Sequence, residues 1–307
     1  MIRLVGGRVL GAIPTLFAII LLGFVLMRLA PGGPFDAERA LPPEVEANLR
    51  AQYDLDAPLP QQFLRYVSDL ARFDFGPSFK YKDFTVAELI ADGAPVSATL
   101  GGAALGIATV LGIALGSAAA LNRRSWLDSA VMGLAVSGQV IPTFVIGPIL
   151  ALVFGLWLGW LPLAGWGGGK PAYLLLPVVT LALPYVASIA RLMRASLIET
   201  MSENFIRTAR AKGASPARIL LRHALPPALL PVVSYLGPAA AGLLTGSVVV
   251  ETIFGLPGIG RYFVQGAINR DYTLVLGVVI LYGGLIVVFN MLTDLIYGGL
   301  DPRVRQA

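Results

Sequence analysis

Charged side chains are sparse in this 307-residue sequence, and many of the basic ones gather in residues 204–233. That segment reads NFIRTARAKGASPARILLRHALPPALLPVV and carries five Arg or Lys side chains but no Asp or Glu. Guanidinium and ammonium groups bind carboxylates on a partner surface and do not by themselves catalyse a reaction. The chemistry indicated is electrostatic docking. The basic residues are Arg207, Arg210, Lys212, Arg218 and Arg222.

Turn-forming residues divide this segment. Gly213 is placed to end one helix, because glycine takes the left-handed conformation at little cost. Ser215 is a good N-cap, and Pro216 suits the first helical position, where no backbone donor is needed. Pro226 disfavours helical backbone at Leu225, so the helix should stop at about residue 224. The sequence therefore predicts a short basic helix over about 216–224 between two turns.

Motifs for catalysis or nucleotide binding are missing from the sequence. It holds no GxxxxGK[ST], HExxH or GxSxG pattern, which argues against a P-loop ATPase, a metalloprotease and a nucleophile-elbow hydrolase. With no cysteine and a single histidine, His223, it lacks thiol chemistry and the ligands for a zinc or haem site. GLPGIG at residues 255–260 has the wrong spacing for a phosphate loop and is interpreted as a structural turn. We expect a non-catalytic chain with no cofactor or metal of its own.

The composition is that of an integral membrane protein. Hydrophobic residues make up 56% and charged residues 13% of the chain, and the mean hydropathy is +0.75. Several apolar runs reach the ~20 residues that cross a ~30 Å hydrocarbon core. They are aperiodic and rich in Gly and Pro, which favours helices over the alternating strands of a barrel. The predicted spans are residues 9–30, 97–121, 129–154, 173–194, 228–250 and 272–293, with Pro142 and Pro148 interrupting the third.

Basic residues in the short connections predict the orientation. Arg3 and Arg8 precede the first span, Arg123 and Arg124 follow the second, and the basic segment 204–233 lies between the fourth and the fifth. By the positive-inside rule these regions face the cytoplasm, so both termini are expected there. The same rule explains the pI of 9.6 without a nucleic-acid partner. It also leaves an alternative for the basic segment, in which its charges only hold the loop inside.

Acidic groups at membrane depth would indicate ion coupling, and only Glu251 and Asp294 qualify. Both lie near predicted span ends, which favours a place at the membrane–water interface over a role as a proton carrier. A gating or packing role for Glu251 stays open. Together with Pro257 and Gly258 it forms a candidate gate or outer loop, and residues 256–270 are expected to be that loop.

The expected fold is an all-α polytopic bundle of six transmembrane helices with a small extracytoplasmic helical insertion after the first span. Residues 1–30 form the N-terminal cytoplasmic end and first helix, 31–96 the extracytoplasmic cap, and 97–307 a five-helix core with the cytoplasmic loop at about 196–227. The cap holds six basic and eleven acidic residues, with helical patterns at 43–53 and 61–72. It either covers the outer ends of the spans or serves to dock a partner or gate the substrate.

The basic segment resembles the EAA loop, the cytoplasmic piece by which permeases of binding-protein-dependent ABC importers seat their ATPases. The family pattern is Glu-Ala-Ala, three residues, Gly, nine residues, Ile, one residue, Leu-Pro. RTARAKG in place of the Glu-Ala-Ala start is similar to the variant of peptide permeases. Ala209, Gly213 and Leu225-Pro226 match the pattern, whereas Arg207, Thr208 and His223 stand at the positions of the Glu, the first Ala and the Ile.

Further motifs resemble the B-type permease subunit of oligopeptide ABC importers along essentially the whole chain. They are IPTLF at 13–17, RLAPGGPF at 28–35, LPPEVEANL at 41–49, DFGPSFKYKDF at 74–84, ETIFGLPGIG at 251–260, NRDYTLV at 269–275 and LDPRVR at 300–305. The resemblance implies the type I ABC importer permease fold in a bacterial cytoplasmic membrane, moving oligopeptides inward. It also implies a second, homologous permease, two ATPases that bind ATP and magnesium, and an extracytoplasmic peptide-binding protein.

Two alternatives stay open beside this reading. One is the permease of a nickel or other small-solute ABC importer. The other is an autonomous secondary transporter, which should show coupling residues within its spans and repeated broken helices.

The same resemblance implies that the loop docks onto an ATPase. The residues expected at that contact are Ala209, Arg210, Lys212, Gly213, Ser215, Pro216, Arg218, Ile219, Leu225 and Pro226.

Overall fold

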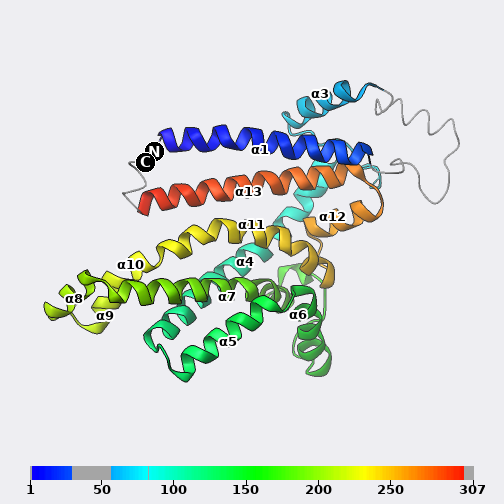
Figure 1. The fold of residues 1–307 in the computed structure, drawn as a ribbon. Coiled ribbons are helices and arrows are strands. Elements are labelled where there is room, and N and C mark those ends of the chain that lie inside the picture. Colours follow the sequence, from blue (N-terminus) through cyan, green and yellow to red (C-terminus); the bar gives the residue numbers. More distant parts are fainter. Residues whose placement is uncertain (1, 30–56, 82, 301–307) are drawn as a thin grey trace.

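A computed structural model describes residues 2–29, 57–81 and 83–300 of the protein. Helices dominate it, as the sequence predicts, and the long ones lie roughly along a common direction (Figure 1). In chain order they are α1 (Ile2–Leu29), α3 (Leu59–Leu70), α4 (Val86–Leu121), α5 (Trp126–Val140), α6 (Thr143–Leu150), the π-helical η1 (Ala151–Trp157), the 3₁₀ turn η2 (Gly167–Gly169), α7 (Pro171–Ser202), α8 (Asn204–Ala211), α9 (Pro216–Arg218), the π-helical η3 (Ile219–Ala224), α10 (Leu225–Ala228), α11 (Leu230–Ile253), α12 (Ile259–Ile268) and α13 (Tyr272–Leu300).

Six crossings account for the long apolar helices in the described part of the chain. Helices α1, α4, α7, α11 and α13 are each long and apolar enough to span a membrane. Helix α5, followed by α6 and η1, makes a sixth, broken crossing that bends by 105° between Val140 and Thr143. The predicted interruption at Pro142 is confirmed, whereas Pro148 lies inside α6 and does not end it.

Helix α4 begins earlier than predicted. It starts at Val86 and continues through Pro95 to Leu121. Its first turn is stabilised by a capping box, in which Thr85 Oγ1 accepts the Glu88 N–H (3.2 Å) and the Glu88 carboxylate accepts the Thr85 N–H (2.8 Å). The proposed boundary between residues 96 and 97 therefore falls inside a helix. The Thr-x-x-Glu signature is present in the sequence at residues 85–88, but the boundary was taken from the apolar run, which starts at residue 97.

The outer connections are also more helical than predicted. Residues 256–270, expected as a loop, contain α12, a helix of ten residues. Helix α3 agrees with the pattern at 61–72, whereas the helix predicted over 43–53 lies outside the described residues. Helix α3 packs on α1 through Phe63, whose ring makes edge contacts with Phe17 and Phe24 at centroid distances of 5.9 and 5.3 Å.

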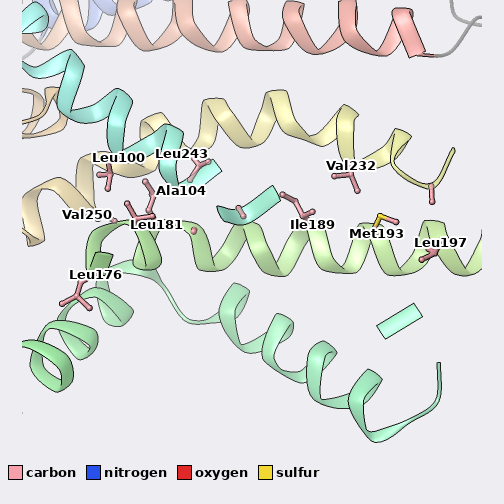
Figure 2. Close-up of a cluster of buried hydrophobic side chains, with 14 of the residues drawn as sticks. Leu100, Ala104, Leu176, Leu181, Ile189, Met193, Leu197, Val232, Leu243 and Val250 are labelled. Carbon is pink, nitrogen blue, oxygen red and sulfur yellow. The ribbon is translucent and has the colours of Figure 1, made fainter. Parts of the chain in front are cut away.

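Helix α7 is the centre of the bundle and packs closely against α4. Gly112 and Gly116 allow this approach, because a Cβ at either position would overlap Ile189, Ala190 or Met193 of α7. Figure 2 shows the core that results, with side chains from α4, α7 and α11 meeting along α7. Gly102 and Gly106 have the same spacing of four residues on α4, but they face open space instead.

The bundle has two distinct ends. Helices α8 and α9 lie at one end, together with the start of α1 and the end of α13 (Figure 1). Helices α3, α6 and α12 lie toward the other end (Figure 1). We call these the loop end and the cap end.

Candidate functional site

The coupling loop, residues 203–228, projects at the loop end as a series of short helices. Helix α8 ends at Ala211, and the chain turns at Gly213, which has φ +76°. The Gly213 N–H donates to the Arg210 carbonyl (3.0 Å), and the Ala214 N–H reaches back to the Ala209 carbonyl (3.2 Å). These bonds form a Schellman motif, as glycine at this position predicts. No atom lies within 4 Å of a Cβ placed on Gly213, so the backbone conformation, not lack of space, requires glycine.

The second half of the loop also starts as predicted but ends differently. Ser215 Oγ caps α9 by accepting the Arg218 N–H (3.4 Å), with Pro216 in the first turn. The chain then continues helically through η3, α10 and α11. The stop predicted at Pro226 is wrong, because Leu225 keeps helical angles of −62° and −45°. The wide π turn of η3 precedes Pro226 and Pro227, which occupy the first turn of α10, where proline is tolerated.

One side of the coupling loop is anchored in the protein core. Ile206 and Ile219 are 0% and 3% exposed and pack in the cluster that includes Leu197 of α7. Ile219 is therefore not exposed for the ATPase contact that was expected of it from the sequence. Ala209 and Leu225 are half-buried against the same cluster, so only part of each side chain is exposed for a contact.

The opposite side of the loop is exposed and basic. Leu221 and Phe205, not predicted as contact residues, are 63% and 45% exposed among these charges. Apolar side chains in a basic surface are typical anchors of a protein interface. The predicted contact residues that the structure exposes are Arg210, Lys212, Gly213, Ser215, Pro216, Arg218 and Pro226. These seven, with Leu221 and Phe205, are called the docking surface below.

An ion pair near the loop end joins α5 to α7. Arg194 Nε lies 2.5 Å from Asp128 Oδ1, and its Nη2 lies 2.8 Å from Oδ2. The Asp128 carboxylate also accepts the Arg124 N–H (3.0 Å), and its side chain is only 7% exposed. Bidentate pairing fixes the relative orientation of two helices. From the sequence, position 194 was only the end of the fourth predicted span, 173–194.

At the cap end, Glu251 lies near the end of α11 and is fully buried. Its Oε1 accepts a bond from Ser97 Oγ of α4 (2.7 Å), and its Oε2 accepts the Gly260 N–H of α12 (2.8 Å). Ser97 Oγ accepts the Ile259 N–H (3.0 Å) in turn. One carboxylate therefore joins the ends of α4, α11 and α12, which corresponds to the packing role left open by the sequence.

The GLPGIG segment forms the structural turn that was predicted, and it closes over this carboxylate. Gly255 turns the chain with φ +62°. Gly258 precedes α12, and a Cβ there would overlap Glu251 and Ser97. Pro257, between them, is half-buried. Gly255 is needed for the positive φ of the turn, and Gly258 and Gly260 for close approach to α11.

A further contact holds α12 against α4. Tyr262 Oη donates to Asp92 Oδ2 (2.9 Å). Burial, assisted by the neighbouring carboxylate, raises the pKa of Tyr262 to about 12, so the phenol remains a donor at physiological pH. Among the described residues, no three His, Cys, Asp or Glu side chains are placed to hold a metal ion.

Comparison with families and curated proteins gives consistent matches. The family model for the binding-protein-dependent transport system inner membrane component matches residues 112–306. The chain is 53% identical over 305 residues to the oligopeptide transport system permease protein OppB of Haemophilus influenzae, and 54% identical to OppB of Escherichia coli, with 99% of this chain and 100% of each relative covered. It is 43% identical to the dipeptide transport system permease protein DppB of Bacillus subtilis, over 95% of this chain and 94% of that protein.

Solved structures show the same fold. A chain of the MetNI methionine ABC transporter in an inward-facing conformation superposes with a TM-score of 0.59 at 19% identity, covering 70% of this chain and 97% of that one. A chain of an amino acid ABC transporter gives a TM-score of 0.54 at 17% identity, covering 68% and 93%. At these identities the similarity shows the fold alone.

Proposed function

We infer the function of this chain from one premise: it belongs to the family of binding-protein-dependent transport system inner membrane components. Its helices form the type I ABC importer permease fold, and the chain is a multi-pass membrane protein. We propose that it forms part of the transmembrane pathway of an ATP-driven importer of oligopeptides. The observation that carries this proposal is the identity of more than half over essentially the full length of oligopeptide permeases.

The alternatives receive less support. The dipeptide permease DppB, a further relative, also names a peptide as its substrate, and this favours peptides over nickel or another small solute. A secondary transporter should carry its own coupling residues. In the described spans the buried Glu251 is instead bonded to two neighbouring helices.

The coupling loop is the proposed contact with a separate ATPase, which would bind the ATP and magnesium. Its exposed side combines basic charge with Leu221, and its other side is anchored beneath α7 through Ile206 and Ile219. A force applied to the docking surface would therefore move α7 as well. The Asp128–Arg194 pair would transmit that movement to α5. Coupling requires that ATP favour one access state through such differential contacts.

Orientation and partners follow from the same proposal. We place the loop end, with both chain termini, in the cytoplasm, because the basic residues gather there. The cap end then faces the outside of a bacterial cytoplasmic membrane, where an extracytoplasmic peptide-binding protein delivers substrate. A second, homologous permease completes the pathway, and two ATPases dock below.

Replacing Gly213 with valine tests the docking proposal. Valine is strained at φ +76°, by roughly 1–3 kcal/mol, so the turn that orients Arg210 and Lys212 should change. We expect Gly213→Val to insert normally but to lose at least tenfold in ATPase co-purification and in uptake of a labelled oligopeptide.

Gly168→Val is the matched control, because Gly168 also has a positive φ (+70°) and open space around it but precedes α7 at its other end. Normal uptake by Gly213→Val would contradict the docking role. A wild-type complex that co-purifies with no ATPase, or that imports nickel but no peptide, would contradict the proposed function itself.

A further inference from the structure

The break between α5 and α6 leaves polar groups inside the membrane. Helix α5 has 15 residues and so spans about 22 Å, less than the ~30 Å of a hydrocarbon core. It starts at Trp126, which is 80% exposed and directly follows the charged turn at Arg123 and Arg124, so its first residue lies at the membrane surface. The chain then bends by 105°, and the crossing continues only after this break, through α6 and η1. The end of α5 therefore lies within the bilayer.

Backbone acceptors are unpaired at this end. The Ile141 N–H still bonds to the Ser137 carbonyl (3.1 Å), but the N–H groups that follow Ile141 do not bond to the next carbonyls of α5. Pro142 has none, and the Val145 N–H bonds to the Pro142 carbonyl (2.9 Å). In the described part of the chain no donor reaches the carbonyls of residues 138–141.

The side chain of Gln139 adds a carboxamide at the same place. It is exposed, and none of the hydrogen bonds among the described residues involves it. Lipid tails cannot hydrogen-bond, so an irregular helix end with a free amide is stable in a membrane only where water or protein covers it.

We propose that this break lines the peptide pathway, with Gln139 and the carbonyls of residues 138–141 binding the N–H and ammonium groups of the passing peptide. The proposal rests on the function proposed above and identifies a substrate-contacting residue for it. An extended peptide has free N–H donors, whereas a neighbouring transmembrane helix has used its own within its backbone. The partial negative charge at the C-terminal end of α5 also favours N–H and ammonium groups.

Cysteine accessibility tests the proposal in a chain that has no native cysteine. Gln139→Cys is introduced into the complete transporter and treated with a positively charged methanethiosulfonate, which reacts in water and not in lipid. The control is Leu22→Cys, because Leu22 is 61% exposed on the outer helix α1. We expect Gln139→Cys to react at least tenfold faster than the control, and a peptide delivered with its binding protein to slow the reaction at least threefold.

A second variant keeps the test decisive if Gln139→Cys does not assemble. Val140→Cys lies at the same break, where Val140 is 72% exposed, and should behave in the same way. A reaction rate equal to that of Leu22→Cys would overturn the proposal. It would also be overturned if cross-linking showed that the second permease alone, and not the peptide, protects the introduced cysteine.

Transport by variants at the same position gives an independent readout. Gln139→Leu should lower peptide uptake about tenfold with ATPase co-purification unchanged, and Gln139→Asn should restore most of the uptake. Full uptake by Gln139→Leu would overturn the contact with substrate. If the wild-type protein imports no peptide although Gln139→Cys reacts quickly, the proposed function is wrong. The conclusion that water reaches the break between α5 and α6 is then retained.

Discussion

Leu221 and Ile219 lie two residues apart in η3 and have opposite environments. Ile219 is 3% exposed and packs in the core cluster beneath α7, whereas Leu221 is 63% exposed on the docking surface. The resemblance to the EAA loop had selected Ile219 as a contact residue and passed over Leu221. The alternation arises because side chains two positions apart on a helix point to nearly opposite sides.

Leu221 is therefore the residue at which the docking surface is best tested. Leu221→Ser removes an exposed apolar anchor without disturbing the core, and interface anchors of this kind contribute about 1–3 kcal/mol. We expect the affinity for the partner ATPase to fall about tenfold or more, measured by titration of the purified permease complex with the ATPase. Leu64→Ser is the control, because Leu64 is 68% exposed but lies on α3 at the cap end. Equal affinities for the two variants would argue against the docking surface.

Glu251 shows how little a residue's type reveals about its role. An acidic side chain near a span end was expected to lie at the interface, and the structure adds that it is 0% exposed and accepts bonds from α4 and α12. Ser97 precedes Glu251 by 154 positions, and the Gly260 donor lies in a different helix, α12, beyond the GLPGIG turn. Local patterning cannot detect such a contact.

At the scale of the elements, α7 connects the membrane core to the coupling loop. It continues to Ser202, and the chain then breaks at Glu203, whose ψ of 152° is extended. In a continuous helix, the spacing of four residues would place Phe205 on the same face as Leu197 and Met201. The break shifts the register, so that Ile206 is buried instead and Phe205 is exposed.

The link between α5 and α7 is tested by Asp128→Asn. The amide removes the charge from the bidentate pair and leaves the partly buried Arg194 guanidinium with a weaker partner. We expect the free energy of unfolding to fall by about 1–3 kcal/mol, seen as a lower melting temperature of the purified complex in detergent. Arg123→Gln, an exposed charge in the same turn, is the control. An unchanged melting temperature for Asp128→Asn would show that the pair contributes nothing to helix packing.

At the scale of the whole molecule, the two ends differ in composition and in shape. The loop end carries α8 and α9 with the basic docking surface, and the cap end carries α3 and α12 (Figure 1). This polarity is what an importer needs if substrate arrives on one side and ATP is hydrolysed on the other.

Cysteine labelling in whole cells tests this polarity. Leu64→Cys should react with a membrane-impermeant maleimide added outside, because α3 lies at the cap end. Leu221→Cys should react only after the cells are permeabilised. Both side chains are well exposed, at 68% and 63%, so accessibility within the fold does not confound the comparison. The reverse pattern would invert the proposed orientation.

The sequence by itself determined the membrane class, the six crossings, the basic loop and its turn at Gly213. These features depend on local properties: apolar length, charge distribution and the conformational freedom of glycine. The interruption at Pro142 belongs with them, since proline acts on its own backbone.

Only the tertiary structure decided which side of each helix is covered. It buried Ile219 and exposed Leu221, placed Glu251 among three helices, and paired Asp128 with Arg194. It also turned the Pro142 interruption into a 105° bend that leaves Gln139 without a partner among the described residues. The physical reason is that burial and pairing depend on segments far apart in the chain, and in an almost uniformly apolar sequence no local pattern distinguishes a helix face covered by protein from one covered by lipid.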